Sequence, residues 1–196
     1  MEQATATLSE RERARDEAAR REQAGKALLS KRRRQILAQT AESLLAGKDP
    51  DQEVLPALYR TLAAERIVDA SLGFIVTDQQ STTMMLGFIK GFPPDVAQRC
   101  LTLDFGQAIC GTVAKTRHPI HATNIQKTLD PLADLVRSAG MTAYACQPLV
   151  VGDNFYGTLS FASRSRRAFE IEDLLFFRDI ARHVAVARSR AIKPKS

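Results

Sequence analysis

Residues 103–116, LDFGQAICGTVAKT, are the stretch that decides the fold of this chain. Gly106 and Gly111 have the spacing of a phosphate-binding loop, and Cys110 lies inside that frame, where a thiol can serve as a nucleophile, a redox sensor or a core side chain. A phosphate-binding loop also needs a lysine after its second glycine and a strand leading into it. Thr112 follows Gly111, and no strand is expected here. We therefore interpret the stretch as a helix over 106–115, in which the glycines permit close backbone packing.

The rest of the chain divides into amphipathic helices and hairpin-forming strands. Asp-Pro pairs at 49–50 and 130–131 supply a cap and a first-turn proline for two of the helices. The expected helices cover 9–46, 50–65, 94–99, 106–115, 131–139 and 170–190, and the expected strands cover 70–77, 82–90, 118–123, 142–151 and 155–163. Hairpins pair antiparallel, so the fold class is α+β with a central antiparallel sheet.

Composition places the chain among soluble globular proteins, with 196 residues, 44% hydrophobic and 26% charged. Neither an apolar membrane span nor a secretory leader is evident, so we expect a cytoplasmic location. The net charge of +6 lies mainly in residues 1–35, which hold ten Lys and Arg against six Asp and Glu. Because that arm mixes both signs and has no aromatics, nucleic-acid and membrane binding are not expected. A basic-armed adaptor for either partner is kept as a second alternative.

The three cysteines argue against both a disulfide scaffold and a zinc site. Cys100, Cys110 and Cys146 are an odd number, and no two lie within the spacing of metal ligands. The expected state is three reduced, buried thiols, and whether they are redox-active stays open.

Four segments in order give the chain a resemblance to the GAF domains of bacterial sensor histidine kinases and related signalling proteins. They are DFGQAICGTVA at 104–114, RHPI at 117–120, Asp130-Pro131 through Arg137, and AYACQPL at 143–149 with GTLSF at 157–161. The resemblance implies a central antiparallel sheet with helices on both faces, a small-molecule pocket on one of them, and terminal helices that pair across a homodimer. It divides the chain into a helical extension at 1–30, a GAF domain at 31–190 and a disordered tail at 191–196.

The resemblance also allows individual pocket chemistries to be tested at their own positions. Covalent bilin would need Cys and His in the helix at 131–139, where Leu132 and Ala133 stand instead, so it is not expected. Free methionine sulfoxide reductases are the enzymatic relatives. Cys100 and Cys110 match two of their cysteines, but no attacking thiol lies near Asp134. Cys146 can replace it only if its strand aims it into the pocket.

Position alone suggests the ligand-pocket residues. Tyr144 and Cys146 share one face of a strand by its period of two, and the helix at 131–139 covers the pocket. The candidates are Phe105, Thr112, Asp134, Arg137, Tyr144 and Cys146, with no catalytic or metal-binding residue among them.

The sequence thus predicts a non-catalytic sensory or regulatory module. It would bind a small molecule of unknown identity and signal through its terminal helices to a histidine kinase or another output protein, as a separate or a fused partner. A thiol-based enzyme resembling the free methionine sulfoxide reductases is the first alternative.

Overall fold

The computed structural model describes the backbone of residues 2–191 and the side chains of residues 13–191. It divides into two units, Met1–Ala38 and Gln39–Ser196. Helix α1 (Glu2–Leu45) begins in the first unit and ends in the second. The expected tail at 191–196 lies outside the described residues, apart from Ala191, which is the last residue of α6.

Residues 13–28 of α1, in the first unit, are all exposed, and their charges of both signs pair along the helix. Arg21 pairs with Glu17, and Lys26 with Glu22, each at an N–O distance of 2.6 Å and a spacing of four residues. The helix is already formed at Glu2, so it begins seven residues before the expected start at residue 9.

A six-stranded antiparallel sheet forms the centre of the second unit, in the order β3-β2-β1-β6-β5-β4. Its strands are β1 (Ala70–Ile75), β2 (Thr83–Lys90), β3 (Thr102–Asp104), β4 (Ile120–Ala122), β5 (Ala143–Val151) and β6 (Asn154–Ser163). The expectation that no strand leads into the LDFGQAICGTVAKT stretch was wrong. β3 ends at Asp104, and its three residues are too few to show the alternation by which a strand is recognised.

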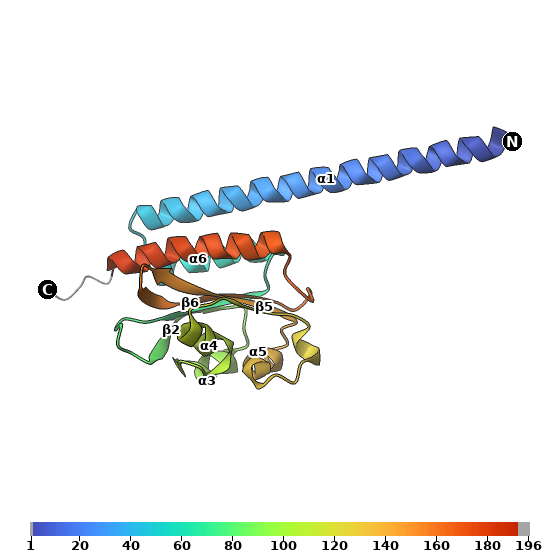
Figure 1. The fold of residues 1–196 in the computed structure, drawn as a ribbon. Coiled ribbons are helices and arrows are strands. Elements are labelled where there is room, and N and C mark those ends of the chain that lie inside the picture. Colours follow the sequence, from blue (N-terminus) through green and yellow to red (C-terminus); the bar gives the residue numbers. More distant parts are fainter. Residues whose placement is uncertain (1, 192–196) are drawn as a thin grey trace. The chain divides into compact units, whose positions relative to one another are not determined.

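Helices cover both faces of this sheet (Figure 1). On one face lie α3 (Pro94–Arg99), α4 (Ala108–Thr116) and α5 (Asp134–Ser138), with short 3₁₀ turns at Ile125–Lys127 and Pro131–Ala133. On the other lie α6 (Ile171–Ala191) and α2 (Leu55–Ala64), which a π-helical turn at Pro50–Val54 precedes. The α+β architecture with helices on both faces is therefore confirmed.

Gly111 explains why α4 can pack directly against the end of β3. A Cβ at Gly111 would lie 2.2 Å from the carbonyl oxygen of Asp104, and the amide of Gly106 donates to the Gly111 carbonyl at 2.7 Å. The close packing expected of this stretch is thus confirmed at Gly111. Gly106 serves a different purpose, since its φ of 94° turns the chain between β3 and α4.

Aromatic packing holds α6 on the sheet. The rings of Phe177 on α6 and Phe161 on β6 stack with their centroids 4.0 Å apart, and Phe169 meets Phe177 edge-on at 5.1 Å. All three side chains are buried, so this contact removes a large apolar area from water.

A buried arginine ties α6 to the middle of the sheet. Arg188 is only 3% exposed; its Nη1 donates to the carbonyls of Phe74 at 2.7 Å and Tyr156 at 3.1 Å, and its Nη2 pairs with the Asp51 carboxylate. Gly157, at φ 121°, leaves the space it needs, since a Cβ there would lie 2.9 Å from Nη1 and 1.9 Å from the Phe74 oxygen. One side chain thereby joins α6, β1, β6 and the turn before α2.

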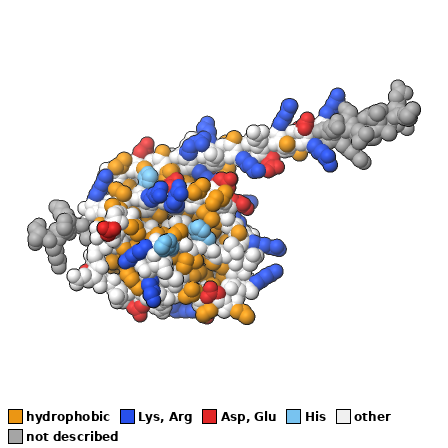
Figure 2. Space-filling view, viewed as in Figure 1, with side chains coloured by type: hydrophobic (Ala, Val, Ile, Leu, Met, Phe, Trp, Pro, Cys, Tyr) orange, Lys and Arg blue, Asp and Glu red, His pale blue; other side chains and the backbone are white. Residues whose placement is uncertain are grey.

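The surface of the second unit carries charges of both signs. Lys and Arg side chains are spread over the face drawn in Figure 2 and alternate with acidic and apolar ones, rather than forming one basic patch. Among the described residues, no helix combines the length and apolar character that crossing a membrane requires.

Neutralising Asp51 should destabilise the domain strongly, because it leaves the Arg188 guanidinium buried without its counter-charge. We expect Asp51→Asn to lower the free energy of unfolding by about 3 kcal/mol, measured by urea denaturation. The matched control is Asp95→Asn, whose carboxylate is 66% exposed and pairs with Arg99 at 3.8 Å. It should cost less than about 0.5 kcal/mol. Equal losses in the two variants would contradict this role of Arg188.

Candidate functional site

The core between the sheet and α3–α5 contains a cluster of polar side chains. Cys110 comes from α4, Tyr144 and Cys146 from β5, and Ser160 from β6. Cys146 and Ser160 are register partners, so their side chains lie on the same face of the sheet. Tyr144 is two residues before Cys146 on β5, so its side chain lies on that face as well. All four are at most 5% exposed. The predicted sharing of one strand face by Tyr144 and Cys146 is what aims both of them at α4.

Cys110 is the centre of this cluster. Its Sγ lies 3.1 Å from the Tyr144 hydroxyl oxygen, 3.4 Å from Ser160 Oγ and 3.7 Å from Cys146 Sγ. We call Cys110, Tyr144, Cys146 and Ser160 the thiol cluster. Its polar groups satisfy one another, which is the condition for burying them in an otherwise apolar core.

The environment separates the acidities of the two facing thiols. The hydrogen bond from Cys146, followed by those from Ser160 and Tyr144, lowers the pKa of Cys110 to about 7 against the opposing effect of burial. Burial raises the pKa of both Cys146 and Tyr144 well above their usual values, and the neighbouring Cys110 raises both further by its charge and its hydrogen bond. Cys110 is therefore the first thiol of the pair to ionise.

A cavity of 410 Å³ opens among α3, α4 and α5. Its walls are Arg99, Leu103, Gln107, Ala108, Pro131, Asp134 and Leu135. The Arg99 guanidinium donates to Ser138 Oγ at 3.3 Å, which holds this cation against the end of α5. The cavity, which we call the α3–α5 cavity, thus offers one positive and one negative side chain beside Gln107 and four apolar residues. Each charge also has a partner outside the lining, Asp95 for Arg99 and Arg137 for Asp134.

A smaller cavity of 200 Å³ lies toward β4. It is lined by Ile109, Ile120, His121, Ala122, Thr123, Thr128, Asp130, Leu132 and Ala133. Burial lowers the pKa of His121, which favours its neutral form, and its Nε2 lies 3.2 Å from Gln147 Nε2. Cys110 follows Ala108 and Ile109, so the residues just before it on α4 line the two cavities in turn.

The structure brings some of the expected pocket residues to these features and places others elsewhere. Asp134 lines the α3–α5 cavity, while Arg137 pairs with Asp134 and donates to the Thr128 carbonyl at 2.8 Å. Thr112 donates to the Ala108 carbonyl at 2.8 Å within its own helix. Phe105 meets Phe155 edge-on at 5.7 Å, beneath the guanidinium of Arg117.

Besides the apolar wall residues Leu103, Ala108, Pro131 and Leu135, sequence reasoning missed three polar residues of the site. Arg99 and Gln107 line the α3–α5 cavity, and Ser160 completes the thiol cluster. Gln107 stands directly before α4, so its position at the mouth of a pocket had a local signal. Arg99 and Ser160 had none, because each acquires its role through contacts made across the fold. Among the described residues, no three His, Cys, Asp or Glu side chains gather in a way that could hold a metal ion.

The family model of the GAF domain matches residues 50–189, and the chain belongs to that family. Solved structures agree in fold. One is the GAF domain of a phosphoenolpyruvate-protein phosphotransferase from Coxiella burnetii, with 21% identity, a TM-score of 0.67, and coverage of 83% of this chain and 95% of that one. A comparison with curated proteins found no match.

Two further structural relatives are enzymes. The free methionine-R-sulfoxide reductase of Neisseria meningitidis, solved with its substrate, is 18% identical with a TM-score of 0.67, over 84% of this chain and 93% of that one. A type II free methionine-R-sulfoxide reductase from Thermoplasma acidophilum is 14% identical with a TM-score of 0.55, over 69% and 89%. These likenesses show the fold, which signalling domains and reductases share.

Removing the Tyr144 hydroxyl should raise the pKa of Cys110, because that hydroxyl stabilises the thiolate. We expect Tyr144→Phe to move the thiolate titration, followed by ultraviolet absorbance, to higher pH and to cost about 1 kcal/mol of stability. Tyr59→Phe is the matched control, since Tyr59 donates its own hydroxyl to the Asp69 carbonyl at 3.2 Å, away from the cluster. It should lose similar stability and leave the titration unchanged; an unshifted titration in Tyr144→Phe would count against the cluster.

Proposed function

We propose that this chain is a non-catalytic regulatory GAF module of the cytoplasm that binds a free amino acid or a similar zwitterion in the α3–α5 cavity. The observation that carries this proposal is the presence of Arg99 and Asp134 on the walls of one cavity. A ligand carboxylate suits the guanidinium, and a ligand ammonium suits the carboxylate. Leu103 and Leu135 supply apolar contact for a ligand side chain.

The size of the cavity and one structural relative support the same class of ligand. A volume of 410 Å³ lies at the lower end of the range for small-molecule sites, about 300–1,000 Å³, and so favours a small ligand. The Neisseria meningitidis enzyme, solved with its substrate, is by name a reductase of free methionine sulfoxide, which is itself a zwitterionic amino acid.

A titration with free amino acids under reducing conditions tests this proposal. At saturation, the binding amino acid should raise the thermal midpoint of unfolding, since a ligand at a hundred times its Kd stabilises by about 2.7 kcal/mol. We expect Arg99→Met and Asp134→Asn each to weaken binding about tenfold, which corresponds to about 1.4 kcal/mol. The panel includes methionine sulfoxide.

Two controls make the test specific for the zwitterion. Asp153→Asn changes an exposed carboxylate in the β5–β6 turn and should leave binding unchanged. An N-acetylated form of the binding amino acid lacks the ammonium and should bind wild type more weakly. Binding that is indifferent to both cavity charges, or no stabilisation by any amino acid of the panel, would refute the proposal.

The route from cavity to output passes through the sheet to α6. Arg188 of α6 holds the backbone of β1 and β6, and on the opposite face of the sheet β6 carries Ser160 of the thiol cluster. A ligand that favours one packing of α3–α5 on the sheet therefore biases the position of α6 by population shift. Within this proposal, α6 passes the change to a second copy of the chain and then to a kinase or other output protein.

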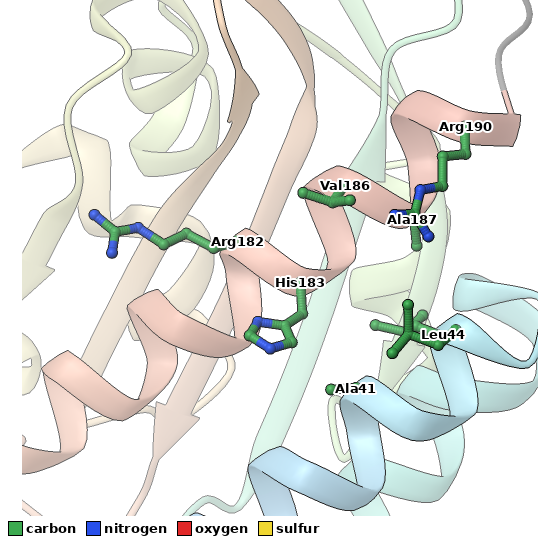
Figure 3. A pocket seen from close by; sticks show the side chains of 8 residues that line it. Ala41, Leu44, Arg182, His183, Val186, Ala187 and Arg190 are labelled. Carbon is green, nitrogen blue, oxygen red and sulfur yellow. The ribbon is translucent and has the colours of Figure 1, made fainter.

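An apolar groove beside α6 supports pairing with a second copy. The groove has a volume of 340 Å³, and the C-terminal turns of α1 and α6 form it (Figure 3). It is lined by Ala41, Leu44, Leu45, Arg182, His183, Val186, Ala187 and Arg190. Leu45 is 70% exposed and Val186 is 39% exposed, so a partner helix would remove both from water.

A charge placed in this groove should separate the dimer. Val186→Lys adds a cation between Arg182 and Arg190, which should prevent association. Because lysine has a high helix propensity, α6 and the fold should persist. Sedimentation velocity should show wild type as a dimer and the variant as a monomer. Leu129→Lys, at a leucine that is 94% exposed outside the groove, should remain dimeric. A monomeric wild type would overturn this part of the proposal.

A thiol-based reductase is the second candidate function, and the approach of Cys146 to Cys110 favours it. The strand does aim Cys146 at the helix that carries Cys110, with 3.7 Å between the sulfurs. An NADPH-coupled assay with free methionine sulfoxide distinguishes the two candidates. The regulatory module binds without turnover, whereas turnover that disappears on changing Cys110 or Cys146 would establish the enzyme.

A further inference from the structure

We propose that Cys110 and Cys146 are a redox-modification site, in which a peroxide converts the facing thiols of α4 and β5 into a reversible disulfide. The observation is the juxtaposition itself, with a separation of 3.7 Å between the two sulfurs inside the thiol cluster. The inference concerns the chain's own covalent chemistry and holds whether or not the α3–α5 cavity takes a ligand.

The geometry leaves a short distance to close. A disulfide bond is about 2.05 Å long, so the two sulfurs need to approach by about 1.7 Å. Cys110 lies on the first turn of α4, and Cys146 is near the middle of β5, between β4 and β6. Each side chain has one free torsion between Cα and Cβ, and a small shift of α4 toward the sheet supplies the remainder.

The two steps need a peroxide and release two molecules of water. The Cys110 thiolate attacks one peroxide oxygen and breaks the O–O bond, which gives a sulfenic acid; the leaving hydroxide takes up the thiol proton as water. The Cys146 sulfur then attacks the Cys110 sulfur and displaces the hydroxyl, which leaves with the Cys146 proton as the second water. Both sulfurs are oxidised by one electron each, and the peroxide is reduced by two.

The surroundings assign different parts to the three cysteines. Cys110 is the attacking thiol because its hydrogen bonds lower its pKa to about 7, whereas burial raises the pKa of Cys146 well above its usual value. Burial also raises the pKa of Cys100 to about 11, and its Sγ donates to the Val96 carbonyl at 2.9 Å. Cys100 therefore stays a core thiol, while the facing pair reacts.

Burial limits the oxidant to a small one. Cys110 is 5% exposed and Cys146 is fully buried, so the proposal requires an oxidant as small as a peroxide molecule, and a disulfide-bearing peptide is too large. Formation of the disulfide moves the Cys110 sulfur, so the hydroxyls of Tyr144 and Ser160 lose their hydrogen bonds to it and must find other partners. Because Gln107 and Ala108 precede Cys110 and line the α3–α5 cavity, its shape should change with the oxidation state.

Mass spectrometry of the folded full chain tests the proposal. After brief treatment with hydrogen peroxide and acid quenching, wild type should lose the mass of two hydrogens and regain it with dithiothreitol. Trypsin should release residues 100–115 joined to residues 138–164. Cys100 and Cys110 share the first of these peptides, so Cys100→Ser makes the assignment to Cys110 unambiguous and should react like wild type.

Variants that lack either thiol of the pair should not form the disulfide. Cys110→Ser and Cys146→Ser should not lose two hydrogens, and Cys146→Ser should gain oxygen on Cys110 instead. Retention of all three thiols in folded wild type, or a crosslink that includes Cys100, would overturn the proposal. These outcomes are independent of the amino-acid titration, which is run under reducing conditions, so either result can fail alone.

Discussion

The arrangement of α6 on the sheet depends on the buried guanidinium of Arg188. A charge with 3% exposure is tolerated only where it is balanced, and the Asp51 carboxylate supplies the counter-charge at Nη2. The Phe74 and Tyr156 carbonyls accept from Nη1, while Nε is buried without a hydrogen-bond partner among the described residues. Each partner belongs to a different element, so the requirement fixes α6, β1, β6 and the turn before α2 against one another. Gly157 follows from the same constraint, since a side chain there would collide with the backbone of β1.

The opposite face of the sheet also buries polar groups, but these groups are neutral and cost less to bury than a charge. Cys110, Tyr144, Cys146 and Ser160 bury thiols and hydroxyls that bond to one another, so no formal charge has to be compensated. The two faces meet at β6, where the Tyr156 carbonyl binds Arg188 and Ser160 contacts Cys110. In the regulatory role proposed above, β6 is the strand through which a change in the packing of α4 would act on α6.

The α3–α5 cavity and the thiol pair both involve helix α4. The first turn of α4 faces the α3–α5 cavity through Gln107 and Ala108 and the thiol cluster through Cys110. A ligand and an oxidant would thus act on one element from neighbouring positions. The fold alone does not fix what such a domain binds, and here α3, α4 and α5 supply the polar side chains of the α3–α5 cavity.

Local signals determined most of the architecture. The caps at Asp49 and Asp130, the turn residues between strands and the apolar periodicity set nearly all the elements, because these effects act over a few neighbouring residues. They failed for β3, whose three residues carry no pattern. Tyr144 and Cys146 could be assigned to one strand face from the period of a strand. Three other features could not be assigned from the sequence: the 3.7 Å approach of Cys146 to Cys110, the pairing of Arg188 with Asp51, and the lining of one cavity by both Arg99 and Asp134. Each joins residues far apart along the chain, and only the packing of helices on the sheet brings their side chains together.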